Sequence, residues 1–258
     1  MSAKNNIGLC LGGGGARGIA HLGVIKALEE LKIPISHVAG TSAGALAGCL
    51  FAAGIKADDI FKEIEKSSWW KIMSPSKLSL GLTSHKYILK LLNAMIAEND
   101  FKALALKFYV CVTNITDGEE WIIENGNLFD SVAASCAIPV LFEPIKLEEK
   151  VCIDGGLLNN MPVQPLKKLK LPTIGVNINE HGKASDLSSM PQIAKRSFNL
   201  AVWRATQANW EMCDVKIDVT AAHDFGLLDF HKGDQLFKLG YEAAMKCENE
   251  LKSLITQE

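Results

Sequence analysis

Residues 7–31, IGLCLGGGGARGIAHLGVIKALEEL, contain a short apolar run, a glycine-rich loop and an amphipathic segment, in that order. The apolar run 7–11 stops at four consecutive glycines, as a buried strand does when it enters a tight loop. Segment 19–31 has helical periodicity, with one apolar face made of Ala20, Val24, Ala27 and Leu31. This stretch therefore predicts strand, glycine loop and helix, the unit from which α/β folds are built.

The glycine loop comprises Gly13, Gly14, Gly15, Ala16, Arg17 and Gly18. Glycines allow several backbone N–H groups to converge, and the N-terminus of the following helix adds partial positive charge, so the loop should bind an anion. The spacing also fits the GxGxxG pattern of dinucleotide-binding folds, but residues 34–44 lack the acidic residue that would hold a ribose. A phosphate-binding P-loop needs Lys where Ile19 stands. A tight structural turn is the remaining alternative.

The second motif, Gly40-Thr41-Ser42-Ala43-Gly44, fits GxSxG. It lies between a short strand at 37–39 and a helical segment that ends near Gly54, the context of a nucleophile elbow. Small residues at Gly40 and Gly44 keep such a turn free of clashes and leave the serine hydroxyl exposed. We therefore interpret Ser42 as a nucleophile, the alternative being a serine that only caps the helix.

A serine nucleophile needs a base. Asp154 ends the apolar run 151–153 and precedes Gly155 and Gly156, so we expect it at the carboxyl edge of the sheet beside Ser42. Asp-Gly is also a common turn dipeptide, which is the structural alternative. An α/β-hydrolase would instead take its base from a later histidine, and three follow the serine: His181, His223 and His231.

The rest of the chain alternates predicted strands and helices. Helices are expected at 58–66, 84–97, 192–211 and 232–255, and strands at 108–113, 121–123, 141–147, 151–153, 173–178 and 215–219. This alternation predicts an α/β fold with three layers, α/β/α, around a mainly parallel sheet. Because no linker or repeat interrupts the pattern, we expect one domain over 1–258, with a motif core at about 7–170 and helices at 190–258.

Composition narrows the function classes. The 258 residues are 48% hydrophobic and 22% charged, with a net charge of −2, so neither a disordered chain nor a strongly basic nucleic-acid binder is expected. Seven cysteines without a CxxC pair suit reduced, buried thiols. The N-terminus lacks a signal-peptide core, and the longest mostly apolar stretch, 43–55, is shorter than the roughly 20 residues of a spanning helix. These features favour a cytoplasmic protein with at most peripheral membrane contact.

GGGGARG, GTSAG and DGG, in this order and at this spacing, resemble the patatin-like phospholipase family, specifically its small bacterial members. The similarity extends to ASCAIPVLFEPI from Ala134, to DGGLLNNMPV from Asp154 and to LDFHKGDQLFKLGYEAA near the C-terminus. It implies a patatin-like fold and a serine lipid acyl hydrolase, a phospholipase, lysophospholipase or carboxylesterase. It also implies a Ser42–Asp154 dyad without a catalytic histidine, and an oxyanion hole formed by the glycine loop.

Two other functions stay open. An acyltransferase could use the same serine, and a non-enzymatic regulator could retain the fold while binding a lipid or a protein. We expect no metal and no cofactor, because no His, Cys and Asp cluster has ligand spacing. The histidines then become structural: His21 beneath the glycine loop and His85 on the surface of a first helical turn. Trp203, Gln207 and Trp210 share a helix face that predicts core packing or a subunit contact.

One segment suggests how the protein meets lipid. Between residues 66 and 90 the chain has no Asp or Glu and carries Lys66, Lys71, Lys77, Lys86 and Lys90. Trp69, Trp70 and Lys71 lie within it, and tryptophan beside lysine is typical of a membrane interface. We hypothesise a flap that docks on anionic membranes, the alternative being a solvated loop whose tryptophans fold back on the body. The sequence does not identify the acyl chain, the head group or the oligomeric state.

Overall fold

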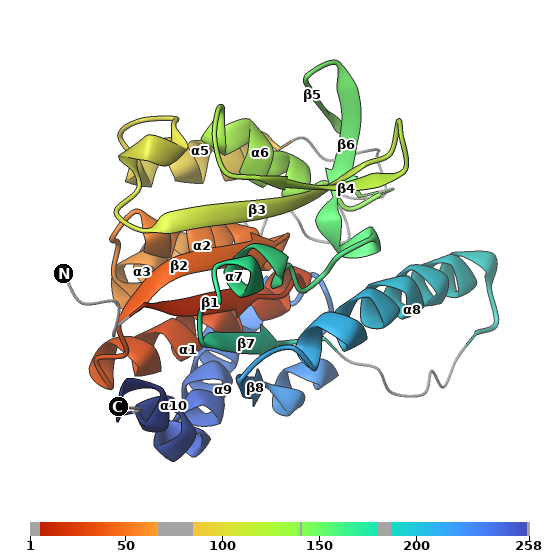
Figure 1. Cartoon of the computed structure of the whole chain (residues 1–258). Helices are drawn as coiled ribbons and strands as arrows, with labels where there is room; N and C mark the ends of the chain where they lie inside the picture. The colour runs from red at the N-terminus through yellow and green to blue at the C-terminus, as the bar shows by residue number, and fades with distance from the viewer. Residues whose placement is uncertain (1–5, 67–84, 140, 180–186, 257–258) are drawn as a thin grey trace.

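The computed structural model describes residues 6–66, 85–139, 141–179 and 187–256, which form a central sheet covered by helices (Figure 1). The strands are β1 (Ile7–Leu11), β2 (Ile35–Thr41), β3 (Lys107–Asn114), β4 (Glu119–Ile123), β5 (Ile145–Leu147), β6 (Lys150–Asp154), β7 (Thr173–Asn177) and β8 (Val215–Asp218). The helices are α1 (Ile19–Glu30), α2 (Ala43–Ala52), α3 (Ala57–Lys66), α5 (Lys86–Met95), α6 (Leu128–Ser135), α7 (Gln164–Lys168), α8 (Met190–Trp210), α9 (Gly233–Lys246) and α10 (Glu248–Thr256). Short 3-10 turns are η2 (Gly15–Gly18), η4 (Phe101–Ala103), η5 (Gly155–Leu157), η6 (Thr220–Asp224) and η7 (Phe230–Lys232).

The centre of the sheet is parallel, as predicted. Its hydrogen-bonded order is β5-β6-β3-β2-β1-β7-β8, with β4 paired to β3. The β3-β2-β1-β7-β8 portion is parallel throughout, whereas β4, β5 and β6 add antiparallel pairs. The sequence prediction of a mainly parallel α/β sheet between helices is therefore confirmed.

An unusual feature of the sheet is that two strands meet end to end on one edge of β3. Strand β4 occupies one edge of β3 at positions 110–114. Strand β2 pairs with positions 107–111 of β3 and β6 pairs with positions 112–114, so both lie on the opposite edge. On that edge Cys111 is in register with Thr41 of β2, and Val112 is in register with Asp154 of β6. The carboxyl ends of β2 and β6 therefore abut.

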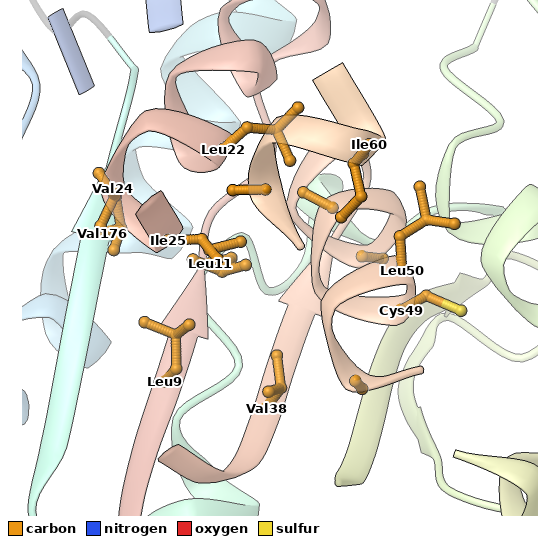
Figure 2. Close-up of a cluster of buried hydrophobic side chains, with 14 of the residues drawn as sticks. Leu9, Leu11, Leu22, Val24, Ile25, Val38, Cys49, Leu50, Ile60 and Val176 are labelled. Carbon is orange, nitrogen blue, oxygen red and sulfur yellow. The ribbon is translucent and has the colours of Figure 1, made fainter. Parts of the chain in front are cut away.

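The main core lies between the sheet and helices α1, α2 and α3. Figure 2 shows Leu9 and Leu11 of β1 near Val38 of β2, with side chains of the three helices packed over them. Helix α9 lies against α1 so closely that a Cβ on Gly23 or on Gly240 would fall 1.9 Å from a backbone oxygen of the other helix. This contact ties a C-terminal helix to the helix that follows the glycine loop.

Three sequence expectations need correction or lie outside the described residues. The predicted closing helix at 232–255 is two helices, because α9 ends at Lys246 and α10 begins at Glu248. The strand predicted at 141–147 is limited to Ile145–Leu147. Segment 67–84, which contains Trp69, Trp70 and Lys71 of the hypothesised flap, lies outside the described residues. Among the helices that the structure describes, none has the length and apolarity to cross a bilayer.

Candidate active site

Ser42 lies on a sharp turn between the end of β2 and the start of α2. Its backbone has φ 54° and ψ −124°, a conformation that costs a non-glycine residue energy and is typical of strained functional sites. The turn depends on small neighbours: a Cβ on Gly40 would lie 2.5 Å from the Gly44 carbonyl oxygen, and one on Gly44 would lie 2.2 Å from the Leu11 carbonyl oxygen. The local geometry is that of a nucleophile elbow.

Asp154 accepts a hydrogen bond from the serine hydroxyl. Ser42 Oγ donates to Asp154 Oδ2 at 2.6 Å, and the Gly156 amide donates to Asp154 Oδ1 at 2.8 Å. Both residues are buried, with 5% and 3% of their surfaces exposed. Burial raises the pKa of Asp154 from its usual range to about 6, although the hydrogen bonds from Ser42 and Gly156 act to lower it.

The route by which Asp154 reaches Ser42 differs from the expectation. We expected Asp154 beside Ser42 at the carboxyl edge of the sheet, where parallel strands end together, and it does lie beside Ser42, but β6 is antiparallel to β3 and approaches from the opposite direction. The two residues meet because β2 and β6 end against each other on β3. Gly155 then passes so close to β3 that a Cβ there would lie 2.3 Å from the Cys111 carbonyl oxygen.

Hydrogen bonds from α6 and its following loop hold both residues in place. Ser135 Oγ accepts from the Ser42 amide at 2.8 Å and donates to the Cys111 carbonyl at 2.7 Å. The Asp154 amide donates to the Ala137 carbonyl at 3.0 Å. Since these groups are buried and paired, the Ser42–Asp154 geometry is defined by the surrounding fold.

The glycine loop borders the same cavity as Ser42 and Asp154. Two of its backbone amides donate hydrogen bonds within the protein: Gly13 N–H donates to Asn160 Oδ1 at 3.0 Å, and Ala16 N–H donates to the Leu227 carbonyl at 2.9 Å. Within the described ranges, the Gly14 and Gly15 amides make no hydrogen bond.

Arg17 and Asn179 hold the other side of this loop. Asn179 Nδ2 donates to the Gly13 carbonyl, and Arg17 Nε donates to the Gly14 carbonyl at 3.2 Å. Arg17 Nη2 also donates to Asn179 Oδ1 at 3.0 Å, which links the two side chains. In a trans peptide the C=O and the next N–H point in opposite directions. The amides of Gly14 and Gly15 therefore point away from the Asn179 and Arg17 side chains.

Two cavities meet at Ser42 and share Gly15, Ile138 and Leu227 in their walls. The larger one, about 90 Å³, is almost wholly apolar and extends past Leu46 and Leu50 of α2 to Ile60 and Ile88. The smaller one contains Asp154 and the glycine loop, and Phe198, Asn199 and Val202 of α8 form one of its walls. The serine thus lies between an apolar channel and a more polar chamber.

None of the described histidines lines either cavity at Ser42. His223 lies 3.6 Å from Asp218 at the end of β8, and His231 lies beside a separate cavity at Phe61 and Phe230. His181 is outside the described residues. The structure therefore does not support His223 or His231 as the base of a catalytic triad with Ser42.

Two other histidines have structural contacts. His21 lies beneath the glycine loop as expected, because its Nε2–H donates to the Gly12 carbonyl at 2.7 Å. Burial lowers the pKa of His21 to about 4, so the ring is neutral at neutral pH. His85, expected on the surface, is buried and packs against Phe142 at 5.4 Å between ring centroids. That expectation was wrong because α5 begins at Lys86, two residues after the predicted start, and the His85 side chain is buried against Phe142.

Sequence reasoning missed several residues of the site, among them Asn160, Asn179 and Ser135. Asn179 closely follows β7, and a polar residue after a buried parallel strand is a signal that could have found it. Ser135 shows no such signal, since it ends an apolar helix. Trp210, from the expected tryptophan face, packs in a core cluster, while Gln207 of the same face is exposed. In the described part of the chain, no three acidic, histidine or cysteine side chains are grouped as metal ligands would be.

Comparisons with known proteins agree with this architecture. A family model described as patatin-like phospholipase matches residues 9–167. Lysophospholipase NTE1 of Meyerozyma guilliermondii is 28% identical over 91% of this chain and 19% of its own length. An NTE family protein of Mycobacterium tuberculosis is 30% identical over 82% of this chain and 59% of its own length. The chain thus spans less than two thirds of either relative.

Among solved structures, the crystal structure of VipD from Legionella pneumophila is similar, with a TM-score of 0.56 and 18% sequence identity. The match covers 98% of this chain and 68% of that one. At this identity the likeness concerns the fold.

Proposed function

Because the chain belongs to the patatin-like phospholipase family, we propose that it is a lipid acyl hydrolase that acts through a Ser42–Asp154 dyad and an acyl-enzyme. The observation that carries the proposal is the buried 2.6 Å hydrogen bond from Ser42 Oγ to Asp154 Oδ2 on a strained turn beside an apolar cavity. A serine hydroxyl is a weak nucleophile, and an adjacent base that can take its proton activates it.

The reaction proceeds in two halves. Ser42 Oγ attacks the ester carbonyl carbon while its proton passes to Asp154 Oδ2, and the carbonyl oxygen becomes an oxyanion. The tetrahedral intermediate then collapses, and the leaving alcohol takes the proton from Asp154. Water, deprotonated by Asp154, attacks the acyl-enzyme, and as the fatty acid leaves, the proton on Asp154 returns to Ser42 Oγ and restores the hydroxyl. The raised pKa of Asp154 makes it a better proton acceptor than an ordinary surface carboxylate.

We assign stabilisation of the oxyanion to the amides of Gly14 and Gly15. They have no partner within the described ranges, and their peptide planes are held from behind by Asn179 and Arg17. Donors oriented before the reaction need no reorganisation when charge develops, which makes them effective in the transition state. The N-terminus of α2 adds partial positive charge at the same place. Arg17 acts in this proposal as a positioning residue.

The apolar cavity is the candidate site for the acyl chain. Its walls of leucine and isoleucine side chains suit a hydrocarbon chain whose carbonyl carbon lies at Ser42. The leaving group would occupy the chamber with Asp154 and α8. The relatives named lysophospholipase make a lysophospholipid the first substrate to test.

The proposal is tested by a fluorophosphonate probe together with product analysis. We expect the wild type to be labelled at Ser42 and to release free fatty acid from a lysophospholipid, and Ser42→Ala to lose both. Cys136→Ala, which changes a buried neighbour of Ser42 that donates to its carbonyl, is the control and should keep its labelling.

Three results would contradict the proposal. Labelling of Ser42→Ala at another serine would contradict the dyad. Transfer to an added acyl acceptor in place of water would indicate an acyltransferase. A wild type that is neither labelled nor active would indicate a binding protein.

A further inference from the structure

Helix α8 is the longest helix that the structure describes, and within the described part of the chain one of its faces stays exposed. Its middle part lines the chamber at Ser42 through Phe198, Asn199 and Val202. In Figure 1 its N-terminal half extends beyond the sheet. Its other face is therefore a surface next to the proposed active site.

That outer face carries three exposed large apolar side chains, with Ser197 and Arg204 in the same arc. Met190, Ile193 and Leu200 are exposed by 74%, 42% and 40%. At about 100° per residue these three side chains fall within an arc of about 80°, roughly opposite the arc of the chamber-lining residues. Exposed large apolar side chains that gather on one helix face mark a contact surface.

The charged residues within α8 itself are all positive. Residues 187–210 contain Lys195, Arg196 and Arg204 and no Asp or Glu, whereas the whole chain has a net charge of −2. An apolar stripe within a basic segment is the pattern of helices that lie in the interface of anionic membranes. A second copy of the same helix would bring these positive charges together, which disfavours a dimer through this face.

We propose that the outer face of α8, formed by Met190, Ile193 and Leu200, docks on the surface of an anionic lipid bilayer. The inference rests on the proposed function, because a lipid substrate is delivered from such a surface. Docking would place the chamber wall formed by Phe198 and Val202 one helix diameter, ~10 Å, from the lipid head groups. The partner is the bilayer surface itself.

The test is flotation with vesicles of phosphatidylcholine alone or mixed with phosphatidylglycerol. The double variant Met190→Gln, Ile193→Gln removes two exposed apolar side chains. Ile115→Gln, Leu169→Gln is the matched control, since those residues are exposed by 52% and 48% and do not belong to α8. We expect the wild type and the control to bind mixed vesicles, and the α8 variant to bind about tenfold or more weakly. Circular dichroism checks that all three proteins are folded.

Activity separates this inference from the proposed function. All three proteins should hydrolyse a monomeric p-nitrophenyl ester equally, and only the α8 variant should lose rate on vesicle-borne substrate. The inference is overturned if the α8 variant binds mixed vesicles as tightly as the wild type does, or if the control variant loses as much vesicle binding as the α8 variant. It is also overturned if the wild type binds neither kind of vesicle. A dimer that the α8 variant loses, with vesicle binding unchanged, would also overturn it. Absent ester hydrolysis with normal α8-dependent binding would instead count against the proposed function alone.

Discussion

The two walls that meet at Ser42 are built in different ways. One wall, made of the glycine loop and the first turns of α1 and α2, lies in the core, and α1 is buried along nearly its whole length. The other wall is α8, whose chamber-lining residues are half-buried and whose far face is exposed. The proposed oxyanion donors lie on the first wall and only substrate-contacting side chains on the second.

The difference separates two requirements. Groups that stabilise a transition state need fixed positions, and a close-packed core provides them. Groups that receive a substrate from a lipid surface need access to that surface, which a helix packed on one face provides. Changes to the core wall should therefore affect kcat or the stability of the whole fold, and changes to the chamber-lining residues of α8 should affect KM alone.

The largest effect is expected from Asp154→Asn. This change keeps the shape of the side chain but removes the base, so kcat should fall by about a thousandfold in an ester assay. Wild-type activity should fall below pH of about 6, as Asp154 becomes protonated, and reach a plateau above it. A wild-type pH profile without this loss of activity below pH of about 6 would contradict the assignment of Asp154 as the base.

The same variant should be more stable than the wild type above pH 6. The folded-state pKa of Asp154 is raised above its unfolded value, so the folded protein holds a proton that the unfolded chain releases, and stability falls as pH rises toward about 6. Because the pKa of Asp154 rises from its ordinary value near 4 to about 6, urea unfolding at pH 8 should show a gain for Asp154→Asn of up to about 3 kcal/mol. The gain should vanish below pH 4.

Asn179→Ala should have the next largest effect on activity. Without its Nδ2 donor, the Gly13 carbonyl is no longer held and the Gly14 amide loses its fixed direction. We expect kcat to fall by about tenfold to a hundredfold with KM little changed. Asn179→Asp keeps an acceptor for Arg17 but lacks the Nδ2 donor, so its kcat should fall by a similar factor. A rise in KM alone would assign the loop to substrate binding.

Gly240→Ala tests how firmly the core wall is held. A Cβ at Gly240 would lie 1.9 Å from the Ala20 carbonyl oxygen, so α1 and α9 must separate. We expect the free energy of unfolding in urea to fall by about 2 kcal/mol, with part of the clash offset by the better helix propensity of alanine. Gly233→Ala on the same helix has room, at 3.4 Å from Phe61, and should be neutral or stabilising. Equal changes in the free energy of unfolding for the two variants would mean that the contact between α1 and α9 adapts easily to an added methyl group.

The smallest effect is expected from Phe198→Ala on the α8 wall. Loss of one half-buried apolar contact should raise KM for a monomeric ester by about threefold to tenfold, with kcat nearly unchanged. Leu200→Ala on the outer face of the same helix should leave KM for this substrate unchanged. A large loss of kcat in Phe198→Ala would place α8 in the transition-state machinery and remove the distinction between the walls.

Local chemistry made much of the fold and half of the site predictable. The apolar run, the glycines and the helical periodicity of residues 7–31 predicted β1, the loop and α1, because strand and helix periods and glycine turns are short-range properties. GTSAG predicted a strained turn at Ser42 for the same reason, and the structure has that turn. The boundaries were less accurate at 141–147 and 232–255, where no strong turn signal marks the ends.

Tertiary structure alone decided how distant segments meet. Ser42 and Asp154 are 112 residues apart, and they touch because an antiparallel β6 occupies the edge of β3 that β2 leaves free. Asn160 Oδ1 likewise accepts a hydrogen bond from the Gly13 amide, 147 residues away in the sequence, so that amide is not available to a substrate. Such pairings depend on which buried polar groups and strand edges lack a partner once the chain is folded, and no local sequence pattern carries that information.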